Sequence, residues 1–360
     1  MLFGGAAAAQ RAGQIQRERS PVLQKAIADA SKQFKIPGIG AAIIEHGQLR
    51  AVEVFGARDL KSGAPVTADT LFEAGSLGEP VYAYSVLAFA ASGQFNPSAP
   101  LPGYLPLPYL RAMDWNATNP DTEKLYDPLF NQITAIRVMN HTAGMPDWAG
   151  KQHLQLQLAP GQKWSYSNEG YLYLQQVMEH VSGESFSAFV TRHALSPSRM
   201  VRGSFTWRDA DAASAATGYD AAGSPVEIHH YVQPAAGSTL ITSVREYAQF
   251  VQFLMASAPA QRAHESAVSL MLAPSVSVAG PAPFSWGLGV ALEKNGDDFY
   301  FMQRGRGAGF ASFVIASRST GSALVIFINS ANGLEAVPDI VRATIGGNHP
   351  ILNSAFFRAH

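Results

Sequence analysis

The sequence predicts an α+β fold, an α/β sandwich in which helices flank an antiparallel sheet and a mostly helical lobe is inserted. Short apolar runs rich in β-branched residues occur near both ends of the chain, at 38–55 and at 286–328, and helical spacing dominates between them. A sheet that takes strands from both ends requires the middle of the chain to be an insertion. The 360 residues suffice for one large domain or two lobes.

The first elements form a helix followed by a hairpin. Residues 21–34 carry apolar side chains at helical spacing and stop before Pro37. Two short apolar strands are expected at 38–45 and 49–55, because the polar stretch 45–48 between them is typical of a turn.

The rest of the chain alternates helices and loops and then becomes strand-rich. After a helix that opens near residue 76, residues 92–132 contain seven prolines and read as irregular. We expect helices at 133–140, 170–181, 244–255 and about 336–345, and strands at 286–290, 299–303, 311–316 and 323–328.

These elements suggest three regions. Residues 1–19 form a flexible N-terminal segment, 20–65 together with 235–360 form the sheet domain, and 66–234 form the helical lobe. We expect an active-site cleft between the sheet domain and the lobe.

The composition of the chain excludes several classes of function. A net charge of −1 and a pI near 6.8 argue against electrostatic binding of nucleic acid. The absence of cysteine excludes disulfides and cysteine zinc sites, and the pair His229-His230 has no third ligand at a convincing spacing, so we predict neither a metal nor a cofactor. No stretch is apolar enough to span a bilayer. The apolar run 1–9 ends in small residues like the remnant of a secretory signal, and we expect a periplasmic or secreted protein.

The stretch 71–80 is the leading candidate for chemistry. Small residues lead to Ser76, Glu79 follows three residues later on the same helical face, and Pro80 is tolerated only in a first helical turn. Ser76 is therefore expected at a helix N-terminus, where the dipole is positive. The position suits a reactive hydroxyl, but taken alone the local pattern favours an ordinary N-cap serine.

Further motifs follow in a fixed order: Asn140 to Asp147, Pro160 to Tyr171, Val181-Ser182-Gly183, Pro234 to Ser238, Trp286 to Gly289 and Gly305 to Phe310. Over residues 20–345 this order resembles the serine β-lactamase and penicillin-binding-protein superfamily, specifically its class C-like esterase and D-aminopeptidase branch. The resemblance implies a serine β-lactamase-like fold. It also implies that Ser76 is the nucleophile, that Tyr166 and Asn168 form the Tyr-x-Asn pair, and that 303–305 replaces Lys/His-x-Gly.

The resemblance further implies an oxyanion hole made by the amides of Ser76 and Arg306. Two departures from the family pattern matter more. Glu79 stands where the family has the lysine of Ser-x-x-Lys, and Gln303 stands where it has lysine or histidine. A carboxylate in place of an ammonium changes the local charge by two units, which removes the usual activation of the serine. Arg304 or Arg306 is the candidate to restore a cation.

We therefore keep three functions open. The favoured one is a hydrolase or transglycosylase that uses carboxylate acid–base chemistry on a glucan or another neutral oligosaccharide, with Glu79 and Glu169 facing each other across the cleft. The sugar rings of this substrate would stack on Tyr82, Trp148, Trp164 or Tyr231, and His230 would face the site. The alternative interpretation, which the local pattern favours, is that Glu169 caps the following helix or complements its dipole. The alternatives are an acyl hydrolase of small-molecule esters or peptides that depends on Ser76, activated by Tyr166 or Glu79, and a non-catalytic ligand-binding protein.

Overall fold

The computed structural model describes residues 20–105, 109–111, 121–123, 128–149, 155–280 and 282–358. The predicted flexible segment 1–19 lies outside the described residues.

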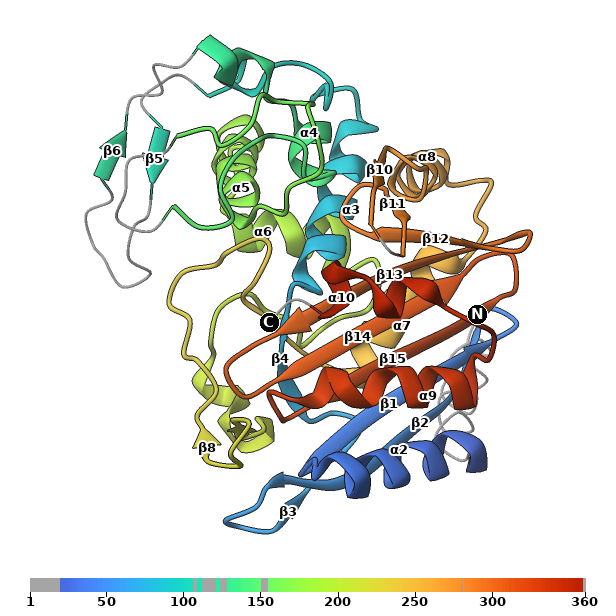
Figure 1. Cartoon of the computed structure of the whole chain (residues 1–360). Coiled ribbons are helices and arrows are strands. Elements are labelled where there is room, and N and C mark those ends of the chain that lie inside the picture. The colour runs from blue at the N-terminus through green and yellow to red at the C-terminus, as the bar shows by residue number, and fades with distance from the viewer. Residues whose placement is uncertain are drawn as a thin grey trace, which may run out of the picture.

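The centre of the molecule is an antiparallel nine-stranded sheet that takes strands from both ends of the chain (Figure 1). The strand order is β10-β11-β12-β13-β14-β15-β1-β2-β3. The strands are β1 (Gly38–Glu45), β2 (Gln48–Asp59), β3 (Ala64–Pro65), β10 (Val276–Val278), β11 (Phe284–Trp286), β12 (Ala291–Asn295), β13 (Asp298–Arg306), β14 (Ala311–Ser317) and β15 (Ser322–Ile328).

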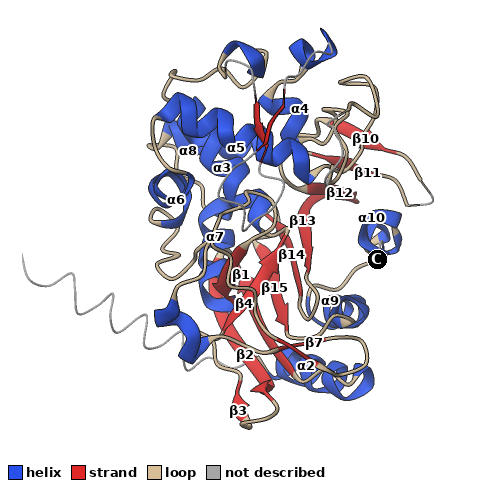
Figure 2. Cartoon of the chain, turned by 90° about the vertical axis from the view of Figure 1, so that its left-hand side faces the viewer, coloured by secondary structure: helices blue, strands red, loops and turns tan. Residues whose placement is uncertain are grey.

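Each face of this sheet is covered, so its central strands are apolar on both sides. Ile39, Ala41 and Ile43 of β1 pack in a core with α2 (Pro21–Phe34) and α9 (Val337–Thr344). Ala42 and Ile44 point the other way, into a core that contains α7 (Val244–Met255) and the helical lobe. Figure 2 shows the two layers on either side of the sheet. Alternation of side chains along the strand produces this division.

The lobe is built around α3 (Gly78–Ala90), which is apolar all round and almost wholly buried, as expected of a central helix. The surrounding helices are α4 (Ala135–Met139), α5 (Asn168–Ser182), α6 (Phe186–Val190), the π-helical turn η3 (Thr191–Leu195) and α8 (Arg262–Met271). Short strands pair as β4 (Leu71–Gly75) with β9 (Leu240–Ser243), β5 (Tyr109–Arg111) with β6 (Asp121–Glu123), and β7 (Gly218–Tyr219) with β8 (Pro225–Val226).

The remaining elements are short. They are the 3-10 helices η1 (Leu101–Gly103), η2 (Pro128–Gln132), η4 (Asp209–Ser214), η5 (Gly333–Ala336) and η6 (Pro350–Asn353), and the last helix α10 (Ala355–Arg358).

The predicted fold class is confirmed, and the helices at 21–34 and 244–255 have the predicted bounds. The strand predicted at 286–290 is wrong: β11 ends at Trp286 and a turn follows, with Gly289 at φ 84°. Gly287 belongs to this turn, where a Cβ would lie 2.2 Å from the Met271 carbonyl oxygen, so close backbone packing replaces strand pairing. The helix α8, which packs on α3, was not predicted, and the predicted domain boundaries stay predictions.

Within the described ranges, no helix combines the length and the apolar character that crossing a membrane requires.

Candidate active site

Ser76 lies at the junction between β4 and α3. The helix begins at Gly78 with Leu77 as its N-cap residue, and the Ser76 side chain does not cap it. Its Oγ instead lies 2.7 Å from the hydroxyl of Tyr166. The N-cap interpretation of Ser76 is therefore wrong, and its partly exposed hydroxyl has a polar partner from another part of the chain.

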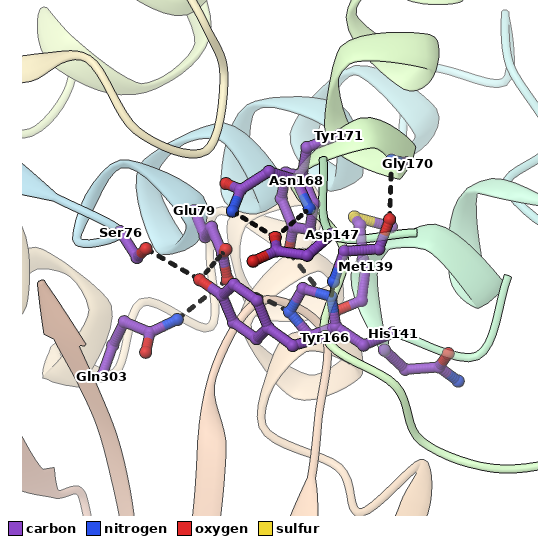
Figure 3. A network of polar contacts seen from close by, with 12 residues as sticks. Ser76, Glu79, Met139, His141, Asp147, Tyr166, Asn168, Gly170, Tyr171 and Gln303 are labelled. Atoms are coloured by element: carbon purple, nitrogen blue, oxygen red, sulfur yellow. Dashed lines mark hydrogen bonds and ion pairs between the residues drawn. The ribbon is translucent and has the colours of Figure 1, made fainter. Parts of the chain in front are cut away.

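Tyr166 bridges Ser76 and Glu79. Its hydroxyl also makes a short hydrogen bond to Oε1 of Glu79 (Figure 3). A tyrosine hydroxyl has one proton to donate. When Glu79 is ionised, Tyr166 must donate to this carboxylate, and Ser76 must then donate its own proton to Tyr166. The three residues form a hydrogen-bonded chain that leads from the Ser76 hydroxyl to a carboxylate.

Glu79 is completely buried, with 0% of its surface exposed. Its Oε2 accepts a hydrogen bond of 2.9 Å from the Gln303 amide and faces His141 Nε2 at 3.3 Å. Burial raises the pKa of Glu79, and the interactions with His141 and Tyr166 oppose this rise. Burial, together with the neighbouring Glu79 charge, holds the pKa of Tyr166 well above its usual range, so Tyr166 keeps its proton.

His141 donates to Glu79 as a neutral imidazole. Its Nδ1 accepts the backbone N–H of Ser167 at 3.2 Å, so this nitrogen carries no proton and Nε2 carries the hydrogen that faces Glu79. His141 therefore also ties its own loop to the start of α5. Its role beside Glu79 was missed, because the two residues are 62 positions apart in the sequence and nothing in the local pattern joins them.

The amides of Ser76 and Arg306 belong to backbones that lie against each other. β12 pairs with β13 only as far as Met302, so the last residues of β13 have a free edge. The Gly307 N–H donates to the Phe310 carbonyl on the side of β14. Successive N–H groups along a strand point to opposite sides, so the Arg306 N–H points away from β14 and toward the free edge. A Cβ on Gly75, which has φ 54°, would lie 2.9 Å from that amide nitrogen. The oxyanion hole stays a prediction that this proximity supports.

Asn168 and Glu169 are turned to other partners. The Asn168 side-chain amide donates to Asp147 Oδ1 at 2.7 Å, and the Asn168 backbone N–H donates to the same oxygen at 3.1 Å. Oε2 of Glu169 accepts from the Ala149 amide at 3.1 Å, and Glu169 is buried. Glu169 therefore fixes the loop between α4 and α5. The helix-capping interpretation is wrong, because the Ser167 side chain caps α5 and Glu169 lies in its first turn. Asp147 was not predicted to have this role.

The aromatic residues predicted to bind sugars are dispersed. Tyr82 is fully buried between Tyr171 and Phe186, so its predicted contact with a ligand is wrong. Trp164 packs against Trp286, with ring centroids 5.4 Å apart. Trp148 is 46% exposed.

The loop that carries His230 and Tyr231 is fixed by Glu73. His230 stacks on Trp207 with ring centroids 4.1 Å apart. The Tyr231 hydroxyl donates to Glu73 Oε2 at 3.1 Å, and the His229 amide donates to Oε1 at 2.6 Å. Glu73 lies on β4 three residues before Ser76, and sequence reasoning did not identify it.

Side chains alternate between the two faces of β13, so Arg304 and Arg306 point to the face opposite Gln303, the residue that bonds to Glu79. Arg304 Nε donates to the carbonyl of Phe356 at 2.6 Å. Arg306 lines a cavity of about 560 Å³ beside the C-terminal helix α10. Neither side chain hydrogen-bonds to Glu79 in the described part of the chain.

Among the described residues, no cluster of three or more His, Asp or Glu side chains is arranged to hold a metal ion.

Comparison with protein families supplies the identity of the fold. The family model described as "Beta-lactamase" matches residues 23–345, which is most of the chain. The chain belongs to the beta-lactamase family. This β-lactamase-family chain is 21% identical over 334 residues to "Protein flp" of Staphylococcus aureus strain MW2, which covers 85% of this chain and 62% of that protein. It is 23% identical over 261 residues to a "Beta-lactamase" of Pseudomonas fluorescens, covering 69% of this chain and 68% of that one.

Solved structures give the same fold for this β-lactamase-family chain. The Beta-Lactamase/D-Alanine Carboxypeptidase from Pseudomonas syringae superposes with a TM-score of 0.76 at 16% identity, covering 91% of this chain and 99% of that one. The D-alanine carboxypeptidase AmpC from Burkholderia cenocepacia gives 0.73 at 20% identity, covering 89% and 97%. At these identities the likeness shows the fold. The predicted superfamily is confirmed, and its members are hydrolases.

Proposed function

We propose that the protein is a serine acyl hydrolase in which Glu79, acting through Tyr166, is the general base for Ser76. The observation that carries this proposal is the bridging hydroxyl of Tyr166, 2.7 Å from Ser76 Oγ and hydrogen-bonded to Oε1 of Glu79. The substrate class is a small ester or amide.

The reaction begins when Ser76 Oγ attacks the acyl carbonyl carbon. The Ser76 proton moves to Tyr166 while the Tyr166 proton moves to Glu79, so Tyr166 stays neutral overall. The negative charge that develops on the carbonyl oxygen is stabilised by the backbone amides of Ser76 and Arg306. When the intermediate collapses, the proton returns by the same route to the leaving alcohol or amine. A water molecule, deprotonated by the same relay, then releases the acid from the acyl-enzyme.

The raised pKa of Glu79 favours this role, since a carboxylate with a higher pKa is a stronger base. The raised pKa of Tyr166 excludes a standing phenolate as the base, so the tyrosine transfers protons without accumulating charge. The resemblance assigns a lysine to position 79, and in this proposal a carboxylate takes over the proton-accepting part of that lysine's task.

The glycoside hydrolase or transglycosylase hypothesis stays a prediction, and the geometry supports it less. Glu79 has no exposed surface on which to meet a glycosidic oxygen, and Oε2 of Glu169 is bonded to the Ala149 amide. Two carboxylates that flank a sugar are what such chemistry requires. The non-catalytic alternative and the exported location stay predictions as well.

A covalent probe separates these functions. A fluorophosphonate should label the wild-type protein but not the Ser76→Ala variant. Ser85→Ala is the control and should still be labelled, because Ser85 is buried in α3 and donates to the Val81 carbonyl. On a panel of p-nitrophenyl esters and aminoacyl anilides, Glu79→Gln and Tyr166→Phe should each lower kcat/KM by about 10²–10⁴-fold. An unlabelled wild-type protein that hydrolyses no ester or amide would refute the proposal. Cleavage of oligosaccharides that depends on Glu79 would then favour the glycosidase.

A further inference from the structure

The end of the chain lies outside the region that matches the family, yet it packs on the candidate site. The family model ends at residue 345, and η6 and α10 follow. We call residues 349–358 the C-terminal segment. Figure 1 shows α10 lying over β13, the strand that carries Gln303 and Arg304. A segment that the family model does not include therefore contributes to the surroundings of Tyr166.

Phe356 makes the closest contacts. Its ring lies 5.0 Å from that of Trp286 and 6.5 Å from that of Tyr166, measured between centroids. The guanidinium of Arg304 lies 5.1 Å above the same ring, and Arg304 Nε donates to the Phe356 carbonyl at 2.6 Å. A stacked and hydrogen-bonded guanidinium is held in one place, because both its plane and one of its donors are constrained.

The charge of Arg304 acts on the relay. The positive charge of Arg304 lowers the pKa of Tyr166, although burial and the Glu79 charge raise it more strongly. Burial lowers the pKa of Arg304, and the Glu79 charge opposes this change. His141 and Gln303 hold Oε2 of Glu79 by hydrogen bonds, and the interaction with His141 opposes the rise that burial causes in the pKa of Glu79. The positive charge of Arg304 adds to this support, because an opposite charge favours the ionised carboxylate.

We propose that Phe356 is a positioning residue for the active site: by stacking on Arg304 and accepting its hydrogen bond, Phe356 holds a cation where it supports the Glu79 carboxylate and the Tyr166 relay. The catalytic part of this inference rests on the proposed function. Its structural part, the coupling between Phe356, Arg304 and Glu79, does not.

The chain offers a matched control in the next residue. Phe357 belongs to the same helix and is also buried, but it packs on Phe313, with ring centroids 5.6 Å apart at 88°. Phe357→Ala removes as large a side chain from α10 without removing the Arg304 contact. Phe356→Tyr keeps the ring and the carbonyl and should behave like wild type.

The test compares pH profiles. The charged or titratable groups that act on Glu79, or on which its charge acts, are His141, Asp147, Tyr166, Tyr171, Tyr247 and Arg304. Removing the cation with Arg304→Gln should raise the pKa of Glu79, and so the acid limb of kcat/KM, by about half a unit to one unit. Phe356→Ala should move it in the same direction by a smaller amount, and Phe357→Ala should not move it. Because Phe356 acts through Arg304, the double variant should match Arg304→Gln alone.

A measurement of the Glu79 pKa that does not depend on turnover separates this inference from the proposed function. The carboxyl carbon of Glu79, labelled with ¹³C and assigned with Glu79→Gln, reports the same pKa by NMR in all these variants. Equal shifts for Phe356→Ala and Phe357→Ala, or additive effects of Phe356→Ala and Arg304→Gln, would overturn the inference. The expected shifts in a protein that hydrolyses no ester or amide would uphold the coupling and refute only the proposed function.

Discussion

Gln303 Nε2 lies 2.9 Å from Oε2 of Glu79, and it approaches this oxygen from the sheet while His141 approaches it from the lobe at 3.3 Å. The side chain of Gln303 is fully buried. The two uncharged donors therefore hold a carboxylate in the interior without neutralising it.

Replacing Gln303 by lysine should place an ammonium against Glu79. An opposite charge at this distance favours the ionised carboxylate and lowers its pKa by about 1–3 units. We expect the acid limb of kcat/KM to move to lower pH by a similar amount. Gln303→Met, which removes the donor and adds no charge, is the control and should move the limb upward. A lysine variant with an unchanged acid limb would show that Glu79 is not the group that titrates there.

Glu79→Gln should make the protein more stable and less active. Burial raises the pKa of Glu79 above its ordinary value of 4.5, so the folded state binds this proton more tightly than the unfolded state. The free energy of unfolding of the wild type should then fall as the pH rises from 4.5 through the raised pKa, and stay level above it. Above that range the glutamine variant should be more stable by about 1.4 kcal/mol for each unit of the rise.

Urea unfolding across the acidic-to-neutral range measures this difference. Glu335→Gln, in the surface helix η5, is the control and should follow the wild-type curve. A Glu79→Gln variant that is less stable than wild type at neutral pH would mean that the hydrogen bonds to the carboxylate outweigh the cost of burying its charge.

Restoring lysine at position 79 should not restore the chemistry that the resemblance implies. The two groups that face Oε2 of Glu79 are both hydrogen-bond donors, His141 Nε2 and Gln303 Nε2, and an ammonium would meet them with donors of its own. We expect Glu79→Lys to lose about 3 kcal/mol of stability, because a buried charge is left without compensation. Glu79→Met isolates the loss of the carboxylate. If the lysine variant turned over esters faster than wild type, Glu79 would not be the working base.

The sequence predicted the fold because the strands of the sheet are apolar, β-branched and separated by clear turns. It failed where tertiary contacts override local pattern, as at Gly287, where close packing against the Met271 carbonyl replaces a strand. Ser76 and Glu79 were identified as site residues from the local pattern, and Tyr166 and Gln303 through the resemblance. The structure brings all four into contact.

The partners that tune this site were not predictable in the same way. His141 joins Glu79 across 62 positions, and Phe356 meets Arg304 across 52. No periodicity links residues at such separations, since they come together only through the topology of the sheet and the lobe. Glu169 illustrates the opposite case: its position next to a site motif suggested a part in the chemistry, whereas in the structure its Oε2 bonds to the Ala149 amide.

Glu293 should be the anchor that keeps the C-terminal segment in place. His349 is buried, and its ring nitrogens lie 2.6 Å from Glu293 Oε2 and 3.1 Å from the Gly346 carbonyl oxygen. The other carboxylate oxygen of Glu293 accepts the Ile351 amide at 2.9 Å. Glu293→Gln replaces one of these two carboxylate oxygens by an amide N–H, which breaks a buried hydrogen bond, and we expect a loss of about 1–3 kcal/mol.

The expected consequence is local as well as global. Limited proteolysis of Glu293→Gln should cut within the C-terminal segment sooner than in wild type, and the acid limb of kcat/KM should move as in Phe356→Ala, because a displaced segment no longer holds Arg304. Lys294→Gln, a change at the exposed neighbouring position of β12, should cost less than about 0.5 kcal/mol and change neither reading. If Glu293→Gln lost stability while the segment stayed resistant to protease, Glu293 would stabilise the sheet rather than hold the segment against β13.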